Sequence, residues 1–288
     1  MGIKAYFKGS KAIKLHKKGE NEAAKRLYEE AFAEGLNDPR FLLPYALLII
    51  REGQYQEAKE FLVKHQKAPG MTPNQRVELM VYYAVCCFRL NNVDKGIDTL
   101  EQQFRKTQTG LIYQTLGYLY VEKYDLSRKP DFAAVAAAAA EPETAEATET
   151  QETPADAAEA PAEEGAEAEK KRTPKEEWKA GVEKAEAFIL QSVDYDDEDP
   201  ICLDNMGQFI YRVKGDKTGA RQWFDKAIAL KDTQIDTLWY LSRYDLDNGD
   251  EKAALEKLEK AAEGRFSPLN YCDRDMVKQE IARLKGEH

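Results

Sequence analysis

Apolar residues recur every three or four positions along most of the chain, which is the spacing of amphipathic helices. Runs that alternate apolar and polar residues, as strands do, do not occur. Short polar breaks containing glycine or asparagine interrupt the helical pattern. They lie at Lys18-Gly19, Glu52-Gly53, Asn91-Asn92, Lys214-Gly215-Asp216 and Asn248-Gly249-Asp250. The pattern predicts an all-α chain of short helices joined by tight turns.

Small side chains mark a repeat within this helical pattern. Ala12, Ala24 and Ala31 are separated by 12 and then 7 positions. The same spacing, or one residue more, recurs in Ala46/Ala58/His65, Ala84/Gly96/Gln103, Gly207/Ala220/Ala227 and Ser242/Ala254/Ala261. Two antiparallel helices approach closely only where a small side chain separates them. We therefore expect helix pairs that stack on one another, with the third position of each set allowing the next pair to stack.

These residues resemble the tetratricopeptide repeat family. Tyr113, Leu116-Gly117 and Tyr120 match the first helix of its motif with an aromatic substitution, and Gly249-Asp250 is followed by a typical second-helix start. The first three repeats are degenerate: Lys8 replaces a large apolar residue, and His65 and Gln103 replace the last small one. The resemblance implies a right-handed superhelical solenoid of about six helix pairs, in which the first helices line a concave groove. We expect a final capping helix near Asp273–Lys285, because the last repeat of a solenoid has no neighbour.

One interval does not fit the repeat. Gly117 and Gly207 are 90 residues apart, whereas the other starts are separated by 33 to 38. Ala185 and Ser192 are spaced by seven and suit the second helix of the pair whose first helix contains Gly117. If 56 of the 90 residues between Gly117 and Gly207 are an insertion, the remaining interval is 34, which fits the repeat. We therefore predict an insertion in the turn of the fourth repeat rather than a linker between two domains. The expected segments are 1–125 (repeats one to three and the first helix of repeat four), 126–174 (insertion) and 175–288 (remaining repeats and cap).

The charge of the chain is concentrated in that insertion. Between Ala133 and Glu169 there are ten Glu and one Asp with no Lys or Arg, so this tract carries a charge of −11. Because the net charge of the whole chain is −10, the remaining residues together carry about +1. After Val135 it has no branched aliphatic or aromatic residue, and such a composition predicts disorder. Two roles remain open for this tract. It could only increase solubility, or it could act as a tethered acidic segment that competes with partners for a basic groove.

Catalytic and metal-binding patterns are weak in this sequence. Cys86 and Cys87 are adjacent in an apolar helix, which favours core packing over metal binding, and neither Cys202 nor Cys272 has a neighbouring His. Residues 194–199 are acidic but lack the ligand spacing of a calcium loop. No nucleophile motif or phosphate loop is present. We therefore expect a non-enzymatic protein without cofactor or metal, and the absence of an apolar run or leader pattern favours a cytoplasmic location.

The groove is the main candidate site. Placing the repeat register on the first helices gives an apolar floor with recurrent cations, which suits a protein or peptide segment with acidic flanks. The groove-facing residues are Lys17, Leu47, Arg51, Val85, Phe88, Arg89, Tyr118, Gln208, Tyr211, Arg212, Trp239 and Arg243, with Gln114 and Asp204 on the same faces. The family's clamp for chaperone tails is disfavoured, because Asn205 alone stands at a matching place. We expect a monomeric scaffold or adaptor.

A second candidate surface is the lysine-rich N-terminus. Six lysines precede the first acid, Glu20, and Ile3 and Phe7 lie among them. One interpretation is a capping helix with a basic, solvated face. The alternative is an adaptor that touches an anionic membrane or nucleic acid through this helix. The sequence favours the capping interpretation, so we expect neither a nucleic acid nor a membrane as partner.

Overall fold

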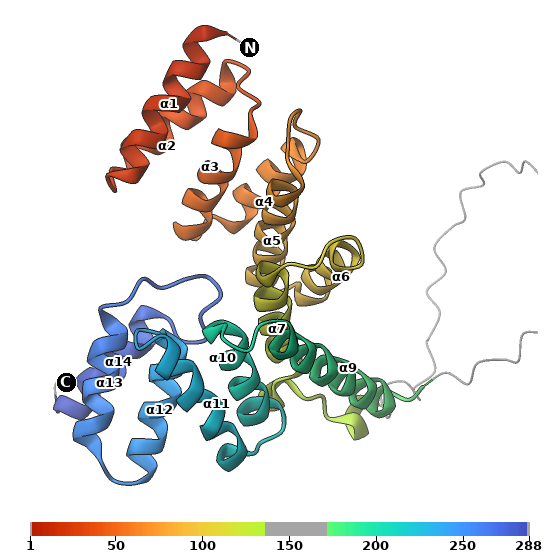
Figure 1. The fold of residues 1–288 in the computed structure, drawn as a ribbon, viewed down its shortest axis with the longest axis vertical. Coiled ribbons are helices and arrows are strands. Elements are labelled where there is room, and N and C mark those ends of the chain that lie inside the picture. Colours follow the sequence, from red (N-terminus) through yellow and green to blue (C-terminus); the bar gives the residue numbers. More distant parts are fainter. Residues whose placement is uncertain (1, 136–171, 287–288) are drawn as a thin grey trace, which may run out of the picture.

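The computed structural model describes residues 2–135 and 172–286, and within them it is helical without strands (Figure 1). The α-helices are α1 (Ile3–Lys17), α2 (Asn21–Ala33), α3 (Pro39–Arg51), α4 (Tyr55–His65), α5 (Pro73–Arg89), α6 (Val93–Phe104), α7 (Gly110–Tyr124), α9 (Pro174–Tyr195), α10 (Pro200–Gln208), α11 (Lys217–Leu230), α12 (Ile235–Asp247), α13 (Glu251–Ala262) and α14 (Arg274–Lys285). A 3₁₀ turn, η1 (Leu126–Arg128), follows α7, and a π-helical turn, η2 (Phe209–Val213), extends α10.

The described helices form six antiparallel pairs and a capping helix, as the repeat predicts. The pairs are α1/α2, α3/α4, α5/α6, α7/α9, α10/α11 and α12/α13, and α14 packs on α13. The first helix of most pairs also contacts the first helix of the next pair, as α3 contacts α5 and α5 contacts α7. In Figure 1 the stack curves from α1 down to α9 and back through α10 to α14.

The repeat register is confirmed by burial. Ala12, Ala24 and Ala31 are completely buried, and so are Ala185 and Ser192. Turns within the pairs use left-handed backbone, for example Gly19 at φ 81° and Gly249 at φ 77°. This conformation is easy for glycine and closes a helix in a single residue. The spacing of small residues therefore identified where helices touch, and the glycines identified where the pairs turn.

The helix starts are fixed by capping side chains. Asp38 accepts a hydrogen bond from the backbone of Arg40, and Asp199 accepts from Ile201 and Cys202, each before a proline in the first turn. Asp273 caps α14 in the same way through Met276. An acceptor at this position satisfies amide groups that the helix itself leaves unpaired.

The predicted insertion separates α7 from α9, which nevertheless pack on each other. Tyr124 at the end of α7 contacts Trp178 of α9, and Phe132, beyond η1, contacts the same tryptophan. Residues 136–171 lie outside the described residues, so the expected disorder of the acidic tract and its contact with the groove lie outside them as well. The three-segment division stays a proposal.

Among the described residues, none of the helices is both long and apolar enough to cross a lipid bilayer.

Candidate binding groove

Three successive first helices, α7, α10 and α12, share a cavity of about 460 Å³. Gln114 and Tyr118 line it from α7, Asp204 from α10 and Asp236 from α12. The hydroxyl of Thr115, which is buried on the same wall, has no hydrogen-bond partner in the described residues. The cavity therefore offers hydrogen-bonding groups between the repeats of the C-terminal half.

A loop between α13 and α14 closes one side of this cavity, and the sequence patterns did not indicate it. Gly264, Arg265, Ser267, Leu269 and Asn270 of this loop line the cavity. Figure 1 shows the loop extending from α13 toward α3 and α4. The connection spans residues 263–273, which is longer than a usual tight turn between helices. Its length is the one sequence signal that could have pointed to the loop.

Asp236 holds the loop in place. Its carboxylate accepts hydrogen bonds from the Asn270 side chain at 3.0 Å, the Tyr271 amide at 3.0 Å and the Cys272 amide at 3.2 Å. The Cys272 thiol donates to the same carboxylate at 3.3 Å. Asp236 is buried at the start of α12, and burial raises its pKa. An acidic residue in the first turn of α12 thus acts as an internal anchor.

Asp204 lies beside this anchor and is equally buried. Its two carboxyl oxygens lie 2.5 Å from the Thr237 hydroxyl and 2.7 Å from the Gln208 amide nitrogen. Burial, together with the nearby charge of Asp236, raises the pKa of Asp204 to about 7. An aspartate in this position holds a proton well above the usual range, because ionisation would place a second negative charge in a buried site.

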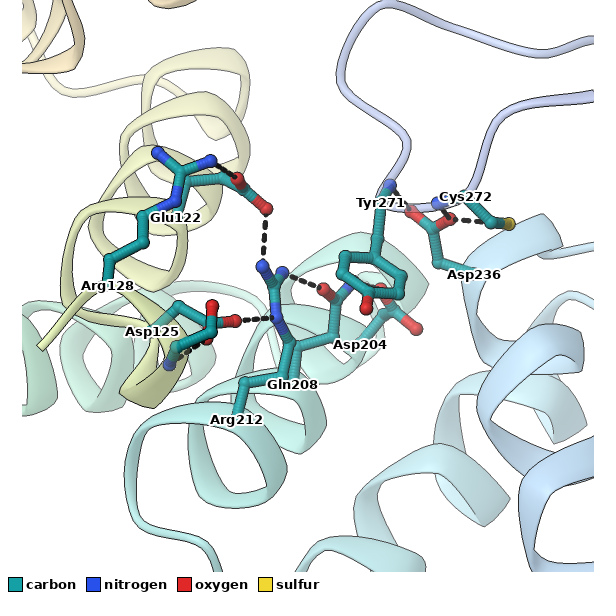
Figure 2. Close-up of polar contacts among 10 residues, drawn as sticks. Glu122, Asp125, Arg128, Asp204, Gln208, Arg212, Asp236, Tyr271 and Cys272 are labelled. Carbon is teal, nitrogen blue, oxygen red and sulfur yellow. Dashed lines mark hydrogen bonds and ion pairs between the residues drawn. The ribbon is translucent and has the colours of Figure 1, made fainter. Parts of the chain in front are cut away.

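Arg212 is committed to the interior of the protein. Its guanidinium bonds Glu122 and Asp125, both at 2.7 Å, and Gln208 at 2.9 Å (Figure 2). Arg128 adds a second cation to Glu122 at 3.0 Å. Arg212 therefore joins α7 to η2 and is not available to a partner, which corrects its expected role as a groove cation.

The π-helical turn explains part of this arrangement. The Lys214 amide donates to the Phe209 carbonyl five residues back, at 3.1 Å. The extra residue per turn rotates the positions that follow it relative to an α-helical register. Tyr211 consequently packs in an aromatic cluster with Phe224, Tyr240 and Tyr244. Its ring is thus used mainly between repeats.

The remaining predicted residues differ in their availability. Arg243 is also engaged, because it bonds Glu280 of the capping helix at 2.7 Å and lies 4.2 Å from the ring centroid of Trp239. Val85, Phe88, Tyr118 and Gln208 are buried, and Phe88 meets the Tyr118 ring edge-on at 5.7 Å. Leu47 and Trp239 are half-buried.

Three predicted cations stay exposed, and all are in the N-terminal half. They are Lys17, Arg51 and Arg89, and none forms an ion pair among the described residues. Arg89 lies over the ring of Tyr55 at 5.4 Å. Arg265 brings a further charge to this region from the α13–α14 loop. Partial desolvation of its guanidinium and then the charge of Arg265 lower the pKa of Arg51. Desolvation, followed by the charges of Arg51 and Arg265, lowers the pKa of His16.

The described residues contain no group of three His, Cys, Asp or Glu side chains placed to hold a metal ion. All four cysteines are buried and unpaired. Burial raises the pKa of Cys86 to about 12 and that of Cys202 to about 12. These thiols are therefore poor nucleophiles at neutral pH.

A family model of subunit 3 of the anaphase-promoting complex, or cyclosome, matches residues 17–103. No curated protein matches the chain significantly. A thermophilic tetratricopeptide-repeat protein from Thermus thermophilus superposes with a TM-score of 0.55 at 16% identity, covering 86% of this chain and 99% of that one. PilW, a type IV pilus biogenesis factor, superposes with a TM-score of 0.55 at 12% identity, covering 93% of this chain and 98% of that one.

A chain of the Cut9–Hcn1 hetero-tetramer of the anaphase-promoting complex superposes with a TM-score of 0.56 at 14% identity. It covers 95% of this chain and 41% of that one. Identities this low establish the architecture and leave partners open. The stacked helix pairs, the register of buried small residues and these similarities agree that the chain has the fold of tetratricopeptide-repeat proteins.

Proposed function

We propose that the chain is a non-enzymatic scaffold that binds an acidic segment of a partner protein in the N-terminal half of its groove. The observation that carries this proposal is the set of exposed cations Lys17, Arg51 and Arg89, none of which forms an ion pair among the described residues. Arg265, from the α13–α14 loop, adds its charge to this set. The charge of Arg265 is felt at Arg51, and neither guanidinium forms an ion pair among the described residues. Two like charges held near each other without a counterion favour an anionic ligand.

The floor of this half supports the same proposal. Leu47 of α3 is half-buried and offers an apolar contact, whereas Val85 and Phe88 of α5 are buried and leave only 5% and 8% of their surface accessible. Tetratricopeptide-repeat folds generally mediate protein–protein contacts. A segment that carries both apolar and acidic side chains would match an apolar floor flanked by cations. Arg212 and Arg243 are neutralised internally, so the C-terminal half contributes hydrogen-bonding groups instead of charge.

The direct test measures binding of a fluorescein-labelled peptide of about twelve Glu and Leu residues by anisotropy, with a Lys-and-Leu peptide of the same pattern as the reference ligand. The R51E/R265E variant should bind the acidic peptide at least about tenfold more weakly, because charge reversal turns attraction into repulsion. The matched control is R26E/R105E, which reverses two exposed arginines, one on α2 and one at the end of α6. The control should stay within about twofold of the unaltered chain.

Equal losses in both variants would show that only net charge matters and would contradict the groove proposal. Equal affinity for the acidic and basic peptides would contradict it as well. The four buried thiols without disulfides support a reducing compartment, and we include a cytoplasmic location in the proposal.

A further inference from the structure

We propose that the outer face of α1 is a second interaction surface, which rests on an anionic lipid bilayer. Two large apolar side chains on this helix point away from the protein: Ile3 is 77% exposed and Phe7 is 66% exposed. They are the two most exposed of the large hydrophobic residues in the described chain. The capping role expected for α1 does not explain them, because a cap that only ends the solenoid would present polar side chains outward.

Lysines surround these two apolar side chains. Lys4, Lys11, Lys14 and Lys18 are exposed, and at about 100° per residue they share with Ile3 and Phe7 a sector of roughly 100° around the helix axis. The opposite side of the helix contains Ala5, Gly9 and Ala12, which are buried. The outer face of α1 therefore consists of apolar side chains within a collar of positive charge.

The lysines of α1 differ in whether an acidic side chain of the protein pairs with them. Lys8, which lies on the flank nearer α2, bonds Glu30 and Glu34, both at 2.7 Å. The ion pairs of the described chain include none of the four outer lysines. The charge on the flank is thus compensated within the protein, whereas the charge on the outer face is left for an external anion.

A lipid surface fits this face better than a nucleic acid does. The helix packs on α2 and α3, and in the described structure its outer side faces away from both (Figure 1). An interfacial helix places apolar side chains at the acyl boundary and its lysines at the phosphate level, where each gains from the negative surface potential. Nucleic acid would use the lysines but would give Ile3 and Phe7 no apolar environment.

The test is cosedimentation of the full chain with vesicles, either of pure phosphatidylcholine or with about 30% phosphatidylglycerol, at about 0.1 M and about 0.5 M salt. Binding is expected only to the anionic vesicles and should fall steeply at the higher salt, since salt screens exposed charges. Two variants separate the contributions: I3S/F7S removes the apolar pair and K11E/K14E reverses two collar charges. Each should weaken binding at least about tenfold.

The matched control is K67E/K106E, which makes the same change in net charge as K11E/K14E, at two exposed lysines in the loops that follow α4 and α6. It should bind within about twofold of the unaltered chain. The circular dichroism melt of every variant is compared first, so that loss of fold is not taken for loss of binding. An F7W variant adds a local readout when its emission is compared with that of the unaltered chain, which contains three tryptophans of its own. The difference between the two spectra should shift to the blue only when the side chain at position 7 enters the bilayer.

Several results would overturn the proposal. Absence of binding to anionic vesicles at low salt is one, and an equal loss in K67E/K106E is another. An unchanged I3S/F7S variant would reduce the contact to unspecific charge attraction and would contradict the docking face. Tighter binding of a single strand of about 30 nucleotides than of vesicles, with no blue shift in F7W, would replace the bilayer by nucleic acid. None of these outcomes depends on the peptide groove, whose arginines stay unaltered in all variants.

Discussion

The guanidinium of Arg212 lies 4.2 Å from the ring centroid of Tyr271, although the two residues belong to different parts of the solenoid. Arg212 is held by Glu122 and Asp125 of the fourth repeat, and Tyr271 belongs to the loop before the capping helix (Figure 2). The Tyr271 ring also meets that of Tyr240, at 5.3 Å. One cation thus connects the middle of the chain to the loop that closes the groove.

Replacing Tyr271 by alanine should release this loop. We expect a loss of about 2 kcal/mol in the free energy of unfolding, from the lost aromatic packing and the exposed face of Arg212. Y271F keeps the ring and should stay within about 0.5 kcal/mol, because the hydroxyl forms no hydrogen bond with the described residues. Urea denaturation measures the stability, and hydrogen exchange of residues 263–273 reports on the loop. Unchanged exchange in Y271A would mean that Asp236 alone holds the loop.

Gly207 marks a place where helices leave no room for a side chain. A Cβ atom there would lie 2.7 to 3.0 Å from three ring atoms of Phe224 on α11. G207A should therefore destabilise the chain by about 1–3 kcal/mol, and G207L by more, in spite of the better helix propensity of alanine. Gly110, at the start of α7, has open space around its Cβ position, so G110A should be neutral or slightly stabilising. Equal melting temperatures for G207A and G110A would contradict this packing.

The repeat architecture follows from local sequence, because its cause is local. A small residue such as Ala24 must lie at a fixed distance from Ala12 for two helices to touch, and Gly19 must lie between them for the chain to turn. Each requirement leaves a spacing in the sequence. The capping helix was also predicted correctly, since Asp273 precedes α14 directly.

The groove could be predicted less completely, because its details depend on distant pairs. Glu122 and Arg212 are 90 residues apart, and no periodicity indicates that they meet. The π-helical turn at Phe209–Val213 has no local marker, yet it changes which side Tyr211 faces. The path of the loop around Arg265 depends on one buried carboxylate, Asp236, whose partners lie 34 to 36 residues away in the sequence.

Removal of residues 136–171 should leave the solenoid folded. Phe132 and Trp178 are in contact at 6.4 Å between ring centroids, so the chain ends on both sides of the segment converge. A Gly/Ser linker of about eight residues, with a reach of roughly 15 Å, should be enough to replace it. The shortened chain should melt cooperatively within about 3 °C of the original, as followed by circular dichroism. W178A in the same background should lower the midpoint, because it removes the packing that draws the two ends together.

Asp204 should make the free energy of unfolding decrease as the pH rises, which is opposite to the effect of a carboxylate stabilised by an ion pair. Its pKa is about 7 in the folded chain, whereas the ordinary value is 3.8. Between these values the folded state retains a proton that the unfolded state has lost, so the free energy of unfolding must fall as pH rises from about 4.5 to about 7. The raised pKa of Asp236 acts in the same direction. Glu280, whose pKa is lowered to about 2 by its hydrogen bond to Arg283, loses its contribution only at lower pH.

The D204N variant isolates this effect. An asparagine amide can donate to the Thr237 hydroxyl and its carbonyl can accept from Gln208, so the neutral bonding pattern is preserved without a titratable group. The unaltered chain should lose a few kcal/mol between about pH 4.5 and about pH 8 by urea denaturation, whereas D204N should lose markedly less and become the more stable of the two at the higher pH. D98N, which removes an exposed carboxylate on α6, should run parallel to the unaltered chain. If D204N shows the same slope as D98N, Asp204 is ionised in the folded protein and its burial is compensated by Arg212, whose charge lies close enough to lower that pKa.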